Sequence, residues 1–117
     1  MRIDLHTHML PPELPDMAAR SGHGGWIRLE PSGPGRARMM QDERFFREIE
    51  ADCWDATPRL EAMDRTGVDV QVLSTIPALF SYGAGAPDAL FLGRVLNDHL
   101  GEVVRAHPRR FVALGTV

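Results

Sequence analysis

The sequence predicts an α/β fold built on a parallel sheet, and three observations support this prediction. Strands typical of a buried sheet are predicted at residues 2–8, at residues 68–75 and at residues 110–117. A helical pattern precedes each of the last two strands, in residues 57–67 and 87–107. Strands joined by helical crossovers run parallel to one another, so we expect one parallel sheet with helices packed on it.

The first predicted strand ends in a His-Thr-His motif. Side chains alternate between the two faces of a strand, so His6 and His8 are predicted on one face, together with Asp4. Ile3 and Leu5 are predicted on the other face, where helices would cover them. Two imidazoles on one face of a strand can bind the same metal ion.

The position of this motif favours a metal site over the alternative, two ordinary surface histidines. Pro11 and Pro12 follow closely, and proline cannot donate to a strand ladder, so the histidines lie at the C-terminal end of the strand. Parallel α/β proteins place their chemistry at that end. Catalytic zinc takes three protein ligands and a water, so His6 and His8 provide only half a site.

An antiparallel insertion is predicted between the first strand and the first helix. A loop rich in proline and glycine follows the first strand, with a short helical stretch within residues 12–20. Alternating or β-compatible residues then predict strands at residues 26–30, 37–41 and 44–49, with a turn at residues 31–35. Residues 22–50 therefore predict a small antiparallel sheet that serves as a lid or side domain.

From residue 57 the pattern predicts two helix-strand units. Thr57 predicts the N-cap of a helix with Pro58 at its first helical position, and Gly67 predicts its C-cap. The helix opened by Pro87 has a predicted buried face of Leu90, Phe91, Val95, Leu96, Leu100, Val103 and Val104. Three parallel strands cannot close an eight-stranded barrel of about 250 residues. The last strand has no helix after it, so the chain is expected to be one part of a longer fold.

Composition excludes several classes of protein. The chain has 117 residues, the length of one domain, and a net charge of −3 that argues against nucleic acid as a partner. No stretch approaches the ~18 apolar residues of a membrane span, and the start is too polar for a secretory signal, so a cytoplasmic protein is expected. The one cysteine, Cys53, cannot form an internal disulfide and is expected to be a buried small hydrophobic residue.

Short motifs spread over the whole chain resemble the N-terminal third of the 2-amino-3-carboxymuconate-6-semialdehyde decarboxylase family, within the amidohydrolase superfamily. The motifs are the opening MRIDLHTHML, Gly24-Gly25-Trp26, Phe46-Arg47, Cys53-Trp54-Asp55, Met63-Asp64, Leu73-Ser74-Thr75, Phe80-Ser81-Tyr82 and Pro108-Arg109-Arg110-Phe111-Val112. The resemblance implies a fold made of the first strands and helices of a (β/α)8 TIM-type barrel, incomplete in this chain, with the antiparallel insertion described above.

The resemblance also implies a zinc-dependent, oxygen-independent decarboxylase of tryptophan breakdown that acts on a dicarboxylate substrate. It implies that His6 and His8 bind the zinc ion, while a further histidine and an aspartate come from later strands that this chain lacks. No other catalytic residue is expected within residues 1–117. Family members are often homodimers in which an arginine of the partner reaches the site.

Arg47 is implied as the residue that binds a substrate carboxylate. The physical case is that a guanidinium offers a planar, bidentate fork to a carboxylate. The same predicted strands carry three other arginines, Arg36, Arg38 and Arg44, and most arginines are solvated surface residues. Four aromatic residues are candidates either for a substrate pocket or for packing: Trp26, Phe46, Trp54 and Tyr82.

Other functions remain open on the sequence. The same histidines would serve an amidohydrolase-type hydrolase of lactones or amides, or a decarboxylase of aromatic acids, because fold does not fix function. A chain with only two metal ligands would also be inactive by itself, which leaves a non-enzymatic truncated product or interaction fragment. Exposed sheet edges would then pair with another chain.

Overall fold

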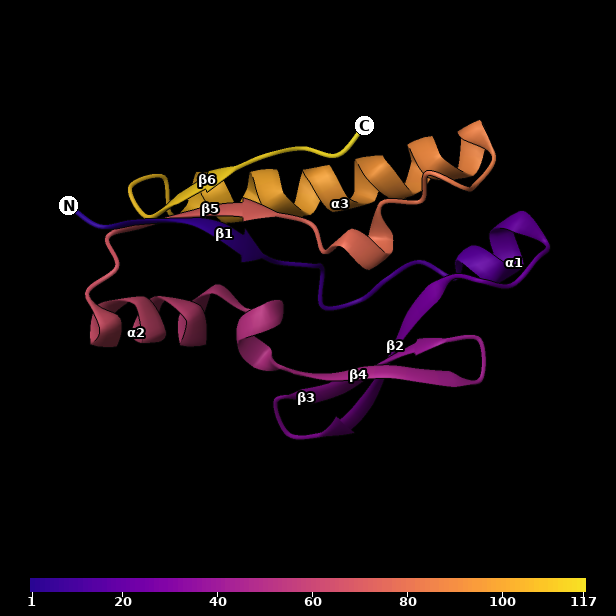
Figure 1. Ribbon diagram of the computed structural model, residues 1–117, viewed down its shortest axis with the longest axis horizontal. Coiled ribbons are helices and arrows are strands. Elements are labelled where there is room, and N and C mark those ends of the chain that lie inside the picture. Colours follow the sequence, from indigo (N-terminus) through magenta and orange to yellow (C-terminus); the bar gives the residue numbers. More distant parts are fainter.

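The computed structural model describes residues 1–117, which form two sheets and three α-helices (Figure 1). In chain order the elements are β1 (Ile3–His8), α1 (Met17–Ser21), β2 (Ile27–Gly33), β3 (Arg36–Gln41), β4 (Arg44–Glu50), the 3-10 turn η1 (Ala51–Cys53), α2 (Ala56–Thr66), β5 (Val70–Ser74), the 3-10 turn η2 (Pro77–Leu79), α3 (Ala86–Ala106) and β6 (Phe111–Ala113).

The parallel sheet is confirmed. Its strand order is β1-β5-β6, and both pairings are parallel. Leu73 of β5 and Phe111 of β6 lie on one face of this sheet, where they pack with Met63 of α2 and with Leu100 and Val103 of α3. Both helices therefore cover the same face, as right-handed crossovers require when each new strand is added on the same side of the sheet.

The other face of the parallel sheet is open. Ile3 is 47% exposed, Leu5 74% and Val112 50%, and no element of the chain covers them. The prediction that helices cover Ile3 and Leu5 is therefore wrong. The reason is that α2 and α3 both pack on the opposite face. The sequence of a single strand does not determine on which of its faces the later helices pack.

The antiparallel insertion is confirmed as β2, β3 and β4, in that order. Figure 1 shows it as a layer separate from the parallel sheet. One of its faces is buried against the loop after β1, α1, η2 and the N-terminal half of α3, through a cluster of Leu10, Met17, Ile27, Ala37, Met39, Ile49, Leu79, Leu92 and Leu96. Strand β2 continues through Pro31 to Gly33. The turn between β2 and β3 is therefore shorter than the predicted one and consists of Pro34 and Gly35.

The helix boundaries differ from the predictions at one cap. Helix α2 is capped by Asp55, whose carboxylate accepts a hydrogen bond of 2.8 Å from the Thr57 N–H, so the prediction of Thr57 as the N-cap is wrong. Pro58 still lies in the first turn, where a missing N–H costs nothing. The Gly67 C-cap is confirmed, with a left-handed φ of 70°.

The long helix α3 is confirmed, and its buried face is slightly rotated from the predicted one. Leu92, Leu96, Leu100 and Val103 are its buried residues, whereas Leu90 is 56% exposed. Although α3 has 21 residues, neither it nor any other helix combines the length and the apolar character that crossing a membrane requires.

Candidate metal and substrate site

The structure brings His6 and His8 together at the C-terminal end of β1. Their ring centroids lie 5.0 Å apart with the ring planes at 87°, an edge-to-face arrangement. His6 is exposed and His8 is half-buried. Imidazole is a preferred ligand of zinc, so the chemistry and spacing of this pair are compatible with two ligands of one metal ion.

Asp4 does not share the face of His8, so that prediction is wrong. Asp4 pairs with Gln71 of β5, and His8 pairs with Ser74. Gln71 and Ser74 are three residues apart and lie on opposite faces of β5, so Asp4 and His8 also lie on opposite faces. The register of β1 shifts between Asp4 and Thr7, which breaks the strict alternation on which the prediction depended.

The ring of His8 is held by the neighbouring strand. Its Nδ1 lies 3.1 Å from Oγ of Ser74, which pairs with His8 in the parallel register. The Met9 N–H donates to the Ser74 carbonyl oxygen at 2.9 Å, and this bond fixes the two strand ends relative to one another. The ring of His6 has no hydrogen-bond partner, and the backbone N–H of His6 donates to the Asp4 carboxylate at 3.3 Å.

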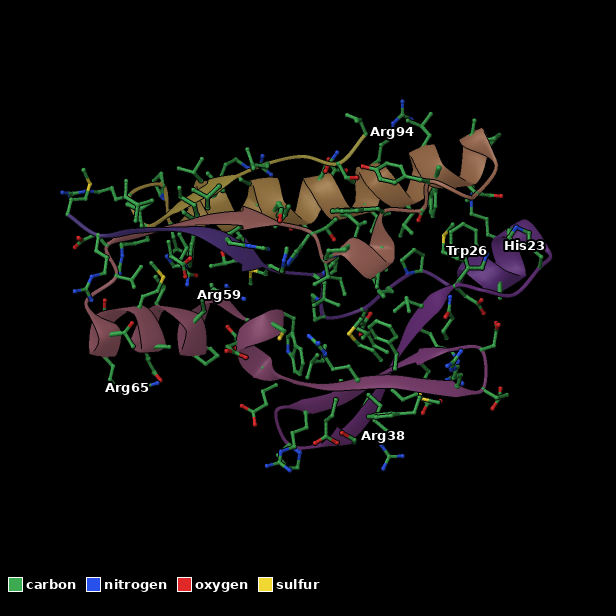
Figure 2. The ribbon with its side chains drawn as sticks, viewed as in Figure 1. His23, Trp26, Arg38, Arg59, Arg65 and Arg94 are labelled. Carbon is green, nitrogen blue, oxygen red and sulfur yellow. The ribbon has the colours of Figure 1, made fainter.

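Arg59 of α2 holds the backbone of His8 from the helix side of the sheet. Figure 2 shows its side chain between α2 and the parallel sheet, and it is only 8% exposed. It donates to the carbonyl oxygens of His8 at 2.6 Å and of Asp52 at 2.8 Å, and to Oε1 of Gln71 at 3.1 Å. Burial lowers the pKa of the guanidinium, while the charge of Asp52 opposes that shift.

Arg47 lies on β4, in the antiparallel sheet. It pairs with Met39, so it shares the sheet face that is buried against the rest of the fold, although its own side chain is exposed. The register places Arg36 and Arg38 on the opposite face, and Figure 2 shows Arg38 pointing away from the molecule. Arg44 shares the face of Arg47 but lies at the hairpin end of the strand.

Arg47 makes no hydrogen bond or ion pair in the structure. The register of β3 and β4 shifts at Phe46, directly before it, and such bulges re-aim side chains next to functional sites. Its guanidinium is therefore free to bind an anion on the inner side of the sheet.

The aromatic candidates separate into two groups. Trp26 and Trp54 line a groove of about 820 Å³ between the segment after β1 and the antiparallel sheet. Neither His6 nor His8 lines this groove. Trp26 is also held by a hydrogen bond from its Nε1 to Oγ of Ser21. Phe46 and Tyr82 are exposed, at 53% and 75%.

No group of three or more His, Cys, Asp or Glu side chains comes together in the structure. His6 and His8 therefore have no third side chain of these types beside them. Cys53 is a free, half-buried thiol that packs against the core cluster of the antiparallel sheet, and burial raises its pKa, which makes it a poor nucleophile.

Ser74 and Arg59, which hold His8 in the structure, are not predicted by the sequence. Ser74 meets His8 only through the register of two strands that are 66 residues apart in the chain, and no local pattern predicts that register. The sequence gives a weak indication that Arg59 is buried, because it lies four residues before the buried Met63 and therefore on the inner face of α2.

Comparison with known proteins gives a consistent assignment. No protein-family model matches the chain. It is 46% identical, over all of its 117 residues, to 2-amino-3-carboxymuconate-6-semialdehyde decarboxylase of Dictyostelium discoideum, and 39% identical over 116 residues to the protein of that name from Caenorhabditis elegans. It spans 33% and 29% of these two relatives, about a third of their length.

Among solved structures, the crystal structure of 5-carboxyvanillate decarboxylase from Sphingomonas paucimobilis matches 97% of the chain with a TM-score of 0.60. The identity is 23%, and the match covers 33% of that protein, so it supports the fold alone. The predicted incomplete barrel with its antiparallel insertion is confirmed. Over its whole length the chain is thus similar to the N-terminal third of 2-amino-3-carboxymuconate-6-semialdehyde decarboxylases, and it has the fold of the first part of a (β/α)8 TIM-type barrel.

Proposed function

We propose that the full-length gene product is a zinc-dependent decarboxylase that converts 2-amino-3-carboxymuconate 6-semialdehyde to 2-aminomuconate semialdehyde without oxygen. The observation that carries this proposal is the sequence similarity over the whole chain to the N-terminal third of two decarboxylases of that name. Residues 1–117 contribute the start of the barrel, two zinc ligands and one substrate-binding arginine.

The histidine pair fits zinc. His6 and His8 present two imidazoles 5.0 Å apart at the end of a parallel strand, and the Nδ1 of His8 is already engaged by Ser74. The Nε2 of His8 is thus the nitrogen that faces away from the neighbouring strand. Zinc, when bound, supplies a Lewis acid that polarises an oxygen atom. Its remaining protein ligands come from outside residues 1–117, since no third ligand lies near the pair.

Arg47 is the proposed anchor for a substrate carboxylate. The substrate carries two carboxylates. A guanidinium that makes no hydrogen bond or ion pair within the protein can bind one of them by donating two parallel hydrogen bonds. Its place on the inner face of the antiparallel sheet distinguishes it from Arg38, which is equally free of partners but lies on the outer face.

The test uses the full-length gene product. The wild type is expected to contain about one zinc per chain and to release carbon dioxide from 2-amino-3-carboxymuconate 6-semialdehyde. His8→Gln should lose both zinc and turnover, whereas His23→Gln, in an exposed loop, should keep both. Wild-type protein that turns over a lactone or an aromatic acid, but not this substrate, would overturn the proposal in favour of the alternative reactions.

Arg47→Ala has a matched control in Arg38→Ala, which lies on the same sheet. Loss of a charged, bidentate contact that holds the substrate should raise KM by roughly 10- to 100-fold, since charged hydrogen bonds contribute about 1.5–3 kcal/mol. Arg38→Ala should leave KM unchanged. Equal kinetics for the two variants would contradict the role of Arg47.

We further propose that the 117-residue polypeptide alone does not catalyse the reaction, because it offers two metal-binding histidines where catalytic zinc takes three protein ligands. Purified residues 1–117 should show no carbon dioxide release above the rate without protein. Zinc-dependent turnover by this polypeptide, free of any longer species by intact-mass analysis, would contradict this.

A further inference from the structure

We propose that Ser74 is a positioning residue for His8. Ser74 fixes the His8 imidazole in the tautomer that carries its proton on Nδ1, and the lone pair of Nε2 is then free for a metal ion. The juxtaposition of Ser74, His8 and the Thr7 carbonyl carries this inference. It rests on the proposed zinc site, and the test below separates the two.

The two side chains meet because of the strand register. His8 ends β1 and Ser74 ends β5, and the two residues are direct partners in the parallel pairing. Their side chains therefore lie on the same face of the sheet, with Oγ of Ser74 3.1 Å from Nδ1 of His8. A serine at this point can reach the ring without any movement of the backbone.

We assign the direction of the hydrogen bond with the help of a second contact. The Ser74 hydroxyl also lies 3.4 Å from the carbonyl oxygen of Thr7, to which it donates. A carbonyl oxygen can only accept, and we assign the one hydroxyl proton to Thr7, so that Oγ accepts from the ring. In this assignment His8 donates from Nδ1, and its Nε2 carries no proton.

The backbone on both sides of this pair is anchored. The Met9 N–H donates to the Ser74 carbonyl at 2.9 Å, and Arg59 donates to the His8 carbonyl at 2.6 Å. The Leu10 N–H is bound in turn to the carbonyl of Cys53 at 3.0 Å. Small movements of the strand end cannot separate Ser74 from His8, so the ring orientation is set before any metal arrives.

His6 provides an internal contrast. Its ring is exposed and makes no hydrogen bond, so neither its tautomer nor its orientation is fixed in residues 1–117. Metal-binding histidines generally donate their second N–H to a fixed acceptor, and loss of that acceptor lowers metal affinity by about 10- to 100-fold. In this chain Ser74 provides such an acceptor for His8 alone.

The neighbouring residue gives a matched control. Thr75 is 2% exposed, and its hydroxyl has no hydrogen-bond partner. Thr75→Val removes a hydroxyl from the same strand end at constant shape, without any contact with His8. Ser74→Ala removes the proposed acceptor, and Ser74→Thr keeps it.

The experiment uses the full-length gene product labelled with 15N in its histidines. In the metal-free protein, two-bond 1H-15N spectra at a pH where the ring is neutral report which nitrogen of His8 carries the proton, with His8→Gln giving the assignment. Zinc affinity is then measured by competition with a chromophoric chelator. Far-UV circular dichroism checks that each variant is folded.

We expect the Nδ1–H tautomer of His8 in the wild type, in Ser74→Thr and in Thr75→Val. Ser74→Ala should shift the ring towards the Nε2–H form and lower zinc affinity by about 10- to 100-fold. A wild-type ring protonated on Nε2, or unchanged tautomer and zinc affinity in Ser74→Ala, would overturn the inference. A wild type with the expected tautomer that binds no zinc would refute the proposed function instead, since the tautomer is read in the metal-free protein.

Discussion

Replacing Arg59 tests how the end of β1 is stabilised. Its guanidinium is buried without a carboxylate in contact and donates three hydrogen bonds, two of them to the backbone carbonyls of His8 and Asp52. Arg59→Met keeps most of the stem and removes all three donors. The amide of Gln71 can turn to another partner, so the carbonyls of His8 and Asp52 lose a donor in part-buried surroundings.

The expected cost follows from two opposing terms. A fully buried acceptor left without a donor costs about 1–3 kcal/mol, and these two partly buried carbonyls lie towards the low end of that range. Removing Arg59 also removes the penalty of burying a charge, which offsets part of this loss. The lowered pKa of the guanidinium shows that this penalty is present. The free energy of unfolding is therefore expected to fall by about 2 kcal/mol.

The assay is urea unfolding of the full-length gene product, followed by tryptophan fluorescence, together with hydrogen exchange at the amide of Leu10. That amide donates to the Cys53 carbonyl beside the Arg59 contacts, so it reports local opening at the strand end. A loss of about 2 kcal/mol corresponds to about 30-fold faster exchange. Arg59→Lys, with one ammonium group, should lie between the wild type and Arg59→Met.

The control is Arg65→Met, on the same helix. Figure 2 shows Arg65 pointing away from the sheet, and its side chain makes no hydrogen bond or ion pair. Its replacement should change stability by less than about 0.5 kcal/mol. If Arg59→Met and Arg65→Met had the same stability and the same exchange at Leu10, the three hydrogen bonds of Arg59 would not stabilise the strand end.

Three further predictions concern other parts of the chain. Burial lowers the pKa of His99 in the folded state, against an opposing effect of Glu102, so the unfolded chain binds the proton more readily. Stability is therefore lost as the pH falls below about 6.5. His99→Gln should flatten this part of a plot of urea midpoint against pH, and an unchanged slope of that plot would contradict the reasoning. Burial raises the pKa of Cys53, so iodoacetamide should modify it more slowly than free cysteine at pH 8, and equal rates would show that the thiol is accessible and ionised. Asp55→Ala removes the acceptor for the Thr57 N–H and should cost about 1 kcal/mol of stability in thermal unfolding, whereas Asp55→Ser should keep most of it; equal losses in the two variants would exclude capping as the cause.

Local patterns in the sequence were sufficient for much of the fold. The alternation and β-branched content of β5, the apolar spacing of α3 and the left-handed cap at Gly67 depend on residues close in the chain, and each prediction was confirmed. The His-Thr-His motif at the end of the first strand is equally local. The sequence by itself therefore determined that two imidazoles lie together at the C-terminal end of a parallel strand.

The supports of the site were decided only by the tertiary structure. A register shift in β1 moved Asp4 to the face opposite His8, and the pairing of β1 with β5 brought Ser74 to the His8 ring from 66 residues away. Arg59 reaches the His8 carbonyl only because α2 packs on that face of the sheet. These contacts depend on strand register and helix packing, which are set by the free energy of the whole fold. Neither can be predicted from the periodicity of the sequence within any one element.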